Sequence, residues 1–273
     1  MVKETHNEEL SLFMEKRSEI SSSSQKHADD LEFWEKRSPS FAQHAGKTRY
    51  PNEFLKLMRL APELTVLDMG CGGGALAIPL AGKVKKVTAV DFSPNMLAIV
   101  EDICRERNIT NIETILGEWD SDWASLGIGK YDIAIASRSL YAESSEPYIR
   151  KLINAARRQV FISSPEGDGP VDTKLLEFVG RKPIARGDYL QIMDVIRSMG
   201  IRADISFIDG NQTNHWPTFE EAVEEQKWMF FNMTRLEDEK IRLYLEQNLI
   251  QKDGMVQLPY ERTCRWAVMW WDI

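Results

Sequence analysis

The sequence predicts a doubly wound α/β fold with a mostly parallel sheet of seven strands and helices on both faces. Three observations support this prediction: apolar strand-like segments alternate with helical ones, a glycine-rich loop follows the first strand, and an acidic residue ends the second. Alternating strands and helices form βαβ units, whose strands run parallel and whose crossovers are right-handed. The strand-like segments are 65–67, 86–90, 111–116, 131–136, 160–163, 201–208 and 263–271.

The helical segments carry their own start signals. Ser93 before Pro94 combines a capping hydroxyl with a proline at the first helical position. Thr218 and Glu221 form a capping box before an amphipathic segment. From such signals and from apolar residues at helical spacing, helices are expected at 29–37, 52–60, 75–81, 93–104, 146–156, 188–199, 218–232 and 241–249.

The chain divides into a polar segment and a single domain. Residues 1–28 are polar and end in four serines at 21–24, so we expect a flexible segment. The domain at 29–273 should have a core built from about 52–210 and 258–273. Two aromatic-rich additions, 29–51 and 211–257, are expected to form a helical cap over the site. The segment 263–271 is almost continuously apolar, as in a strand buried on both faces.

Composition excludes several classes of protein. The 34 Lys and Arg residues are outnumbered by 42 Asp and Glu residues, giving a net charge of −8, which argues against a duplex nucleic acid partner. The three cysteines and four histidines show no disulfide or metal-ligand spacing. No apolar run approaches the ~20 residues that span a bilayer, and the first residues lack a secretory h-region. We therefore expect a cytoplasmic protein without a membrane partner or a metal.

The glycine-rich loop is the most informative motif. Gly70-Cys71-Gly72-Gly73-Gly74 lies between a strand and a helix, an arrangement that lets the backbone approach a ligand closely. Asp91 lies 21 residues beyond Gly70, where an acid hydrogen-bonds a ribose diol. Both a dinucleotide and S-adenosylmethionine (SAM) fit this spacing. Asp68 at the mouth of the loop favours SAM, because a carboxylate repels a pyrophosphate and attracts an ammonium or sulfonium.

With these residues the sequence resembles the class I SAM-dependent methyltransferases, which have a Rossmann-like fold. The resemblance covers about 52–207, with 263–271 as the last strand. It implies that SAM is the methyl donor and S-adenosylhomocysteine (SAH) the product. It also implies that the amino-acid end of the donor is held by Asp68, Gly70, Cys71, Gly72 and Gly74.

The resemblance also assigns the nucleoside end of the donor. Asp91 would hold both ribose hydroxyls, and Phe92 and Met96 would flank the adenine. The family often has Gly-Asp-Ala near the adenine amine after the third strand. This chain has Gly117-Glu118-Trp119 instead, with a longer acid and an indole in place of a small residue.

The fourth strand runs into Ser137-Arg138-Ser139-Leu140-Tyr141, the position that in the family faces both the methyl group and the acceptor. Ser137 is therefore expected on the donor side, and Arg138 and Tyr141 are the catalytic candidates. Two other arginines, Arg37 and Arg49, are candidates for a bidentate bond to the donor's carboxylate. The candidates for acceptor contact are Trp34, Tyr50, His215 and Trp216.

The absence of acceptor-specific motifs favours a small-molecule substrate. The fourth strand lacks the Asn/Asp-Pro-Pro-Tyr element of methyltransferases that modify amines of nucleic acid bases, and no Pro-Cys nucleophile occurs. We expect in-line transfer of the methyl group, accelerated mainly by placement of the reactants, in a monomer or homodimer. Two alternatives remain open: an NAD(P)-dependent oxidoreductase and a non-catalytic SAM-binding protein.

Overall fold

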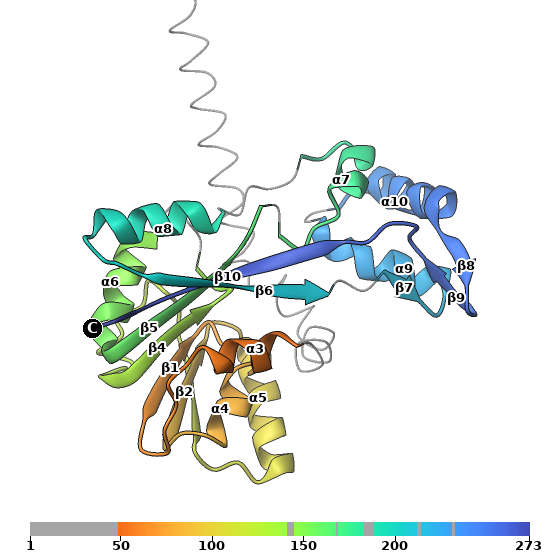
Figure 1. Ribbon diagram of the computed structural model, residues 1–273. Coiled ribbons are helices and arrows are strands. Elements are labelled where there is room, and N and C mark those ends of the chain that lie inside the picture. The colour runs from red at the N-terminus through yellow and green to blue at the C-terminus, as the bar shows by residue number, and fades with distance from the viewer. Residues whose placement is uncertain (1–48, 141–144, 168, 183–187, 212–213, 231–232) are drawn as a thin grey trace, which may run out of the picture.

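The computed structural model describes residues 49–140, 145–167, 169–182, 188–211, 214–230 and 233–273 (Figure 1). It contains a seven-stranded sheet of order β3-β2-β1-β4-β5-β10-β6. The first five strands in the chain pair in parallel, and β10 runs antiparallel to both β5 and β6. The predicted fold class is thus confirmed. The strands are β1 Thr65–Met69, β2 Lys86–Asp91, β3 Ile112–Leu116, β4 Tyr131–Ser137, β5 Ala156–Pro165, β6 Asp204–Asn211 and β10 Thr263–Asp272.

Helices cover both faces of the sheet, and each face has its own hydrophobic core. Successive residues of β1 alternate between the two cores, with Val66 in one and Leu67 in the other. The helices on the Val66 face are α3 Tyr50–Lys56, α4 Ala77–Ala81 and α5 Pro94–Arg107. Those on the Leu67 face are α6 Ser145–Ala155 and α8 Tyr189–Ser198.

Local signals explain where most helices begin. The Ser93 hydroxyl accepts a hydrogen bond from the Met96 amide at 3.3 Å, as the capping motif predicts. The boundaries predicted for the first described helix are wrong: α3 covers 50–56, whereas 52–60 was expected. Pro51 lies in its first turn, where a missing amide hydrogen costs no helical hydrogen bond. The helix therefore begins before the proline.

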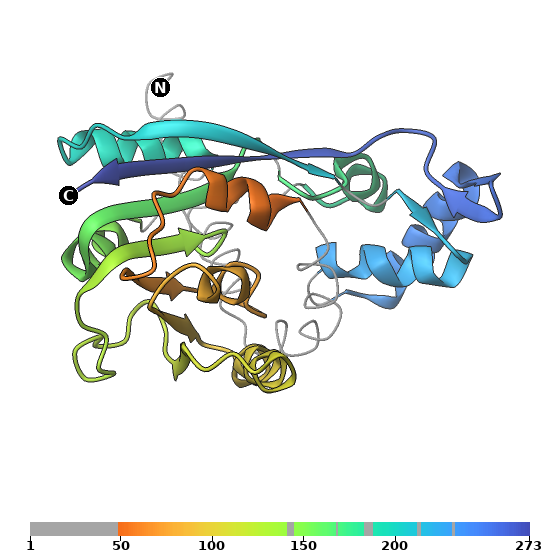
Figure 2. The same cartoon turned by 60° about the horizontal axis from the view of Figure 1, so that its bottom comes forward.

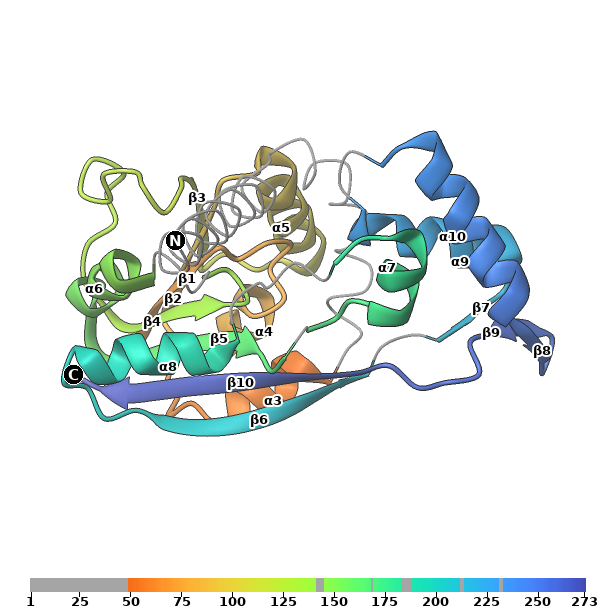
Figure 3. The ribbon, with the colours of Figure 1, turned by 90° about the horizontal axis from the view of Figure 1, so that it is seen from above.

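A second compact unit, which we call the cap, emerges at one edge of the sheet. β5 runs into it, and the register of β10 with β5, Trp266 opposite Pro165, places the start of β10 at the same edge. Figures 2 and 3 show the cap beyond this end of the strands. The cap comprises α7 Thr173–Val179, α9 Phe219–Gln226, the 3₁₀ helix η2 Lys227–Met229, α10 Arg235–Asn248, and the sheet strands β7 His215–Trp216, β8 Ile250–Lys252 and β9 Met255–Gln257.

The cap has a hydrophobic core of its own, to which α7, α9, α10 and β9 all contribute. The helix predicted at 218–232 ends earlier, at Gln226, and continues as η2. The contribution of α7 was not predicted, because 171–180 was assigned to the core of the domain. Nor were β7, β8 and β9, whose two or three residues are too short to show a period. The segments predicted at 1–28 and 29–37 lie outside the described residues.

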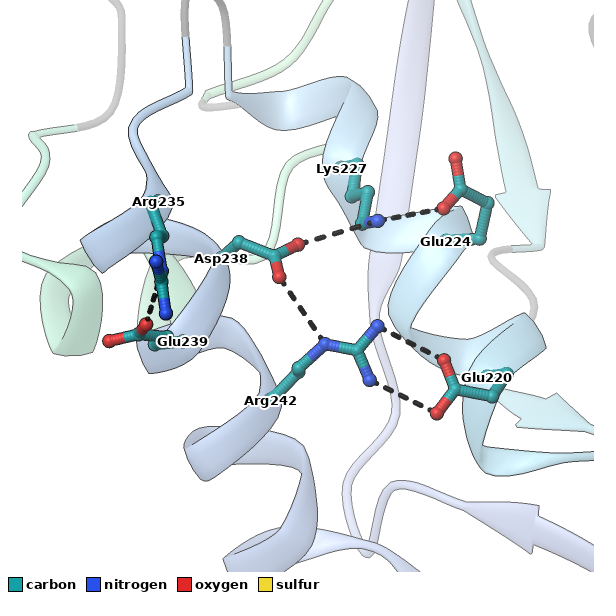
Figure 4. Close-up of polar contacts among 7 residues, drawn as sticks. All are labelled: Glu220, Glu224, Lys227, Arg235, Asp238, Glu239 and Arg242. Carbon is teal, nitrogen blue, oxygen red and sulfur yellow. Dashed lines mark hydrogen bonds and ion pairs between the residues drawn. The ribbon is translucent and has the colours of Figure 1, made fainter.

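Charged side chains join the two long helices of the cap (Figure 4). Arg242 on α10 pairs with Glu220 on α9 at 3.0 Å and with Asp238 at 3.3 Å. Lys227 of η2 bridges Glu224 and Asp238, at 2.9 Å and 3.3 Å. Exposed pairs of this kind contribute about 0–1 kcal/mol each, so they orient α9 on α10 while the apolar core supplies most of the stability.

A buried polar junction ties the cap to the segment that leads into β10. Asp172 caps α7 by accepting a hydrogen bond from the Leu175 amide at 3.1 Å. Its second carboxylate oxygen accepts one from the Tyr260 hydroxyl at 2.7 Å. Tyr260 in turn contacts the Tyr244 hydroxyl of α10, also at 2.7 Å. Asp172 thus links α7 to the segment before β10, and Tyr260 links that segment to α10.

Replacing Tyr260 by Phe should destabilise the protein by about 1–3 kcal/mol, because Asp172 and Tyr244 each lose a hydrogen-bond partner. Urea-induced unfolding measures the difference. Tyr189→Phe is the matched control, because the Tyr189 hydroxyl has no hydrogen bond within the described residues. Equal stability of the two variants would contradict the structural role of the junction.

Candidate functional site

The carboxyl ends of the central strands meet at one edge of the sheet. β1 lies between β2 and β4. From β1 the chain adds β2 and β3 on one side of the sheet, and it then crosses over to add β4 on the other side. In open α/β sheets a ligand binds outside the carboxyl ends of the strands at such a switch point. The glycine loop follows β1, Asp91 ends β2, and Ser137 ends β4. Sequence-predicted site residues from three strands are thus brought together.

The glycine loop has a backbone that only glycine adopts easily. Gly70, Gly72 and Gly74 have φ values of +74°, +53° and +80°. The amides of Gly70 and Cys71 both donate to the Val90 carbonyl oxygen, at 2.8 Å and 3.0 Å. The loop therefore folds over the end of β2 before α4 begins.

Gly70 also leaves no room for a side chain. A Cβ atom placed there would lie 2.3 Å from the Cβ of Ser139, far inside van der Waals contact. Ser139 is fixed in turn, because its hydroxyl donates to the Met69 carbonyl oxygen at 2.7 Å. The segment after β4 thus packs directly against the glycine loop.

Asp91 holds the loop in place from β2. One of its carboxylate oxygens accepts a hydrogen bond from the Gly72 amide at 2.8 Å, and the other from the Ser93 amide at 3.0 Å. Burial raises the pKa of this carboxyl group, against the effect of these hydrogen bonds. A carboxylate has about four lone-pair sites, so both oxygens retain capacity for a diol.

Asp68 is the least satisfied polar group of the site. Its side chain is 1% exposed, and its Oδ2 atom has no hydrogen-bond partner within the described residues. Burial and then the charge of Asp91 raise the pKa of Asp68 to about 7, while the charge of Arg138 and a backbone hydrogen bond from Ala77 lower it. A buried carboxylate oxygen without a donor is costly. The position fits a ligand that supplies a cation.

Family comparison assigns this arrangement. Residues 66–160 match the family described as "Methyltransferase domain", and this stretch contains the glycine loop, Asp68 and Asp91. The chain carries a class I, SAM-dependent methyltransferase domain. SAM is the methyl donor of this domain, and the carboxyl edge of β1, β2 and β4 is the candidate site for it.

Relatives share different lengths of the chain. An uncharacterized protein of Haemophilus influenzae is 24% identical over 243 residues, which cover 88% of each protein. A ubiquinone biosynthesis O-methyltransferase of Rickettsia conorii is 30% identical over 104 residues, covering 37% of this chain and 34% of that one. A Methanosphaera stadtmanae protein named "Probable ribosomal RNA small subunit methyltransferase A" is 27% identical over 145 residues, covering 53% of this chain and 47% of that one. This chain thus spans less than half the length of these two named relatives.

Solved structures share the fold at lower identity. A Bacillus halodurans protein has a TM-score of 0.55 and 13% identity, with 81% of this chain and 97% of that one covered. The [4+2]-cyclase SpnF has a TM-score of 0.50 and 17% identity, with coverage of 81% and 79%. A cyclase shares this architecture, so the fold alone does not determine which reaction is catalysed.

The segment that was predicted to contact the adenine, Gly117 to Trp119, follows β3. A Cβ on Gly117 would lie 2.6 Å from the Cδ1 atom of Leu126, so a side chain there would displace the end of the Leu126 side chain. Glu118 is exposed, with its amide bonded to the Ser121 hydroxyl at 3.0 Å. The Trp119 indole donates to the Ser139 carbonyl oxygen at 3.0 Å. Trp119 therefore connects the segments after β3 and β4, a link that its sequence position alone did not reveal.

Tyr50, predicted to contact the acceptor, is buried against the carboxyl ends of β4 and β5. Its hydroxyl contacts the hydroxyls of Ser137 at 2.8 Å and Ser163 at 2.6 Å, and burial raises its pKa. Sequence analysis did not single out Ser163, and it named Ser139 only as part of the segment that follows the fourth strand. The available signal was a serine at the carboxyl end of a buried strand, since Ser163 follows the apolar residues of β5.

The other sequence-predicted residues have varied positions. Trp216, predicted to contact the acceptor, is 2% exposed and packs in the core of the cap, where its indole donates to Glu225. His215 is exposed on β7, and Arg49 is exposed at the start of α3. Cys71 and Met96 are buried, and Phe92 is half-buried. Trp34, Arg37 and Tyr141 lie outside the described residues.

The described part of the chain has no group of three or more His, Cys, Asp or Glu side chains that could hold a metal ion. Likewise, none of the helices described is long and apolar enough to span a membrane.

Replacing Gly70 by Ala should destabilise the fold by about 2–4 kcal/mol, from left-handed strain and the clash with Ser139. It should also abolish donor binding, because the loop must move. Gly82→Ala is the control: Gly82 has a φ of −74° and no atom within 4 Å of its added Cβ. Urea unfolding and SAH calorimetry measure both effects. A Gly70→Ala protein as stable as the control would contradict the described packing.

Asp68 should impose a pH dependence on stability. Its folded pKa of about 7 lies above the ordinary value of 3.8, so the folded state holds the proton more tightly. Its contribution is then fully present below about pH 4 and is lost as pH rises through 7. The Asp68→Asn variant should gain stability relative to wild type across this window, by up to about 1.4 kcal/mol per pH unit. Urea unfolding at pH 5 to 8 gives the free energy of unfolding of both proteins. If the two values changed in parallel with pH, Asp68 would not be the source of the pH dependence.

Proposed function

We propose that this methyltransferase transfers a methyl group from SAM to a small-molecule acceptor. The observation that carries the proposal is the buried Oδ2 atom of Asp68 at the start of the glycine loop, for which the described part of the chain supplies no donor. An ammonium group of the donor satisfies that oxygen and neutralises a charge whose burial is otherwise unfavourable. A dinucleotide pyrophosphate would bring further negative charge to the same place.

The remaining donor contacts follow the strand ends. Asp91 accepts hydrogen bonds from the ribose hydroxyls while it keeps its backbone partners. The adenine lies between Phe92 and Met96 on one side and the segment of Glu118 on the other, where the exposed Glu118 carboxylate accepts a bond from the adenine amine. The backbone of the glycine loop passes along the amino-acid end of the donor.

The chemistry requires placement above all. SAM supplies an electrophilic methyl carbon: a lone pair of the acceptor attacks it, the sulfur–carbon bond breaks, and SAH leaves. In-line geometry between the two reactants supplies most of the acceleration. The acceptor approaches over the carboxyl ends of β4 and β5, next to the edge from which the cap emerges. The cap then excludes water from the site and shapes the acceptor's surroundings.

A small molecule is favoured as the acceptor over a nucleic acid. The chain has a net charge of −8, whereas nucleic acid binding rests on Lys and Arg contacts to phosphates. One relative, the Rickettsia conorii O-methyltransferase, is named for ubiquinone biosynthesis. We further propose that the protein acts in the cytoplasm, without a membrane partner, as a monomer or homodimer.

Calorimetry with SAM, SAH and NAD tests the donor. SAM and SAH should bind, and NAD should not. Asp91→Ala should weaken SAH binding at least about tenfold, because the ribose loses its acceptor and the loop loses an anchor. Asp209→Ala, an exposed carboxylate on β6, is the control and should bind as wild type does. Binding of NAD without SAM would overturn the assignment in favour of an oxidoreductase.

Turnover with methyl-labelled SAM separates an enzyme from a SAM-binding protein. The label should appear in a small-molecule extract, and it should not appear in RNA offered in parallel. Label in RNA alone would contradict the acceptor class. Tight SAM binding with no transfer to either pool would favour the non-catalytic alternative.

A further inference from the structure

The turn after β4 holds an arginine in an unusual backbone conformation. Arg138 has a φ of +59°, in the left-handed region that long side chains rarely adopt. The turn is fixed by its amide, which donates to the carbonyl oxygen of Ser163 at 3.1 Å and lies 3.2 Å from its hydroxyl. On its other side, Ser139 packs against Gly70. Backbone strain held by surrounding contacts is common where a side chain must be placed for function.

Two aromatic rings contact the Arg138 side chain and restrict its orientation. Its guanidinium carbon lies 4.3 Å from the centroid of the Tyr50 ring and 5.4 Å from that of Trp266, within cation–π range. Tyr50 is itself immobilised, because it is buried and its hydroxyl contacts two serines. In the part of the chain that the structure describes, Arg138 forms no salt bridge. The guanidinium is thus half-buried and oriented, and no carboxylate among the described residues forms a salt bridge with it.

This cation follows the carboxyl end of β4, the strand that pairs with β1 at Asp68. Asp68 pairs with Ile135 across β1 and β4, and Arg138 follows three residues later, in the turn that contacts the glycine loop. The charge of Arg138 lowers the pKa of Asp68, as expected of neighbours in a buried site. Within the described residues, a buried carboxylate oxygen without a donor and a guanidinium without a salt bridge therefore lie at the same carboxyl edge of β1 and β4. An α-amino acid group, with ammonium and carboxylate on one carbon, matches this pair of charges.

We propose that Arg138 binds the α-carboxylate of the donor's amino-acid end while Asp68 binds its ammonium. This assignment rests on the proposed function, because it requires SAM at the glycine loop. It gives Arg138 a role in donor binding instead of at the acceptor. Tyr50 becomes a positioning residue, which acts by holding the guanidinium. Arg138 presents a planar fork that suits a carboxylate.

A carboxylate at Arg138 could come from the donor or from an acidic acceptor. Comparing SAH with decarboxylated SAH, which keeps the ammonium and lacks the carboxylate, separates these sources. Wild type should bind SAH about ten- to a hundredfold more tightly than the decarboxylated analogue, as a charge-assisted pair predicts. The Arg138→Asn variant should bind the two ligands with nearly equal affinity. Asn is chosen because it tolerates the left-handed conformation.

Two further variants make the comparison specific. Arg138→Lys keeps the charge without the planar fork and should retain part of the discrimination. Arg150→Gln removes an exposed arginine paired with Glu146 on α6 and should discriminate as wild type does. Thermal melting checks that each variant is folded.

Full discrimination by folded Arg138→Asn would overturn the proposal, and a simultaneous loss of methyl transfer would then assign Arg138 to the acceptor. Failure of wild type to bind either ligand would instead refute the proposed function. A crystal structure of wild type with SAH gives an independent test if Arg138→Asn does not fold. The Arg138 guanidinium should lie about 3 Å from the SAH carboxylate, and a carboxylate bound elsewhere would refute the assignment.

Discussion

The site depends on an unfavourable burial: the Asp68 carboxylate, which lacks a donor for one oxygen and lies near a second buried carboxylate, Asp91. Burying two carboxylates close together raises the free energy of the folded protein when no ligand is bound. It becomes favourable when a ligand brings a positive charge, so the molecule is incomplete without its donor. The glycine loop serves this requirement. Gly70 lets the turn after β4 approach so closely that Arg138 and Asp68 share one end of the site.

The two carboxylates differ in what they do for the protein. Asp91 accepts two backbone hydrogen bonds and shapes the loop, so part of its role is structural before any ligand arrives. Asp68 has one carboxylate oxygen without a hydrogen-bond partner among the described residues. We propose that this oxygen recognises the ammonium group of the donor. Asp91 therefore fixes the geometry of the glycine loop, whereas Asp68 is left to recognise the charge of the ligand. The cap has a hydrophobic core of its own, separate from the two cores that support the site.

Sequence reasoning found what local chemistry determines. The strands, the Ser93 cap and the loop from Gly70 to Gly74 follow from apolar patterning, capping residues and glycine spacing. It failed where long-range packing decides. Tyr50 meets Ser137 and Ser163 across 87 and 113 residues of sequence, so its role beneath Arg138 has no local signal. Trp216 is one of several aromatic residues before the last strand, and only the folded cap distinguishes an indole in its core from one at a ligand.

In the proposed complex Asp68 loses its proton when the donor binds, and its carboxylate then pairs with the ammonium group of the ligand. Calorimetry of SAH binding at pH 6, in buffers of different ionisation enthalpy, counts the protons exchanged. With an unbound pKa of about 7, Asp68 is mostly protonated at that pH and should release close to one proton on binding. The Asp68→Asn variant should release none. Binding by wild type without proton release, or with uptake, would contradict the account.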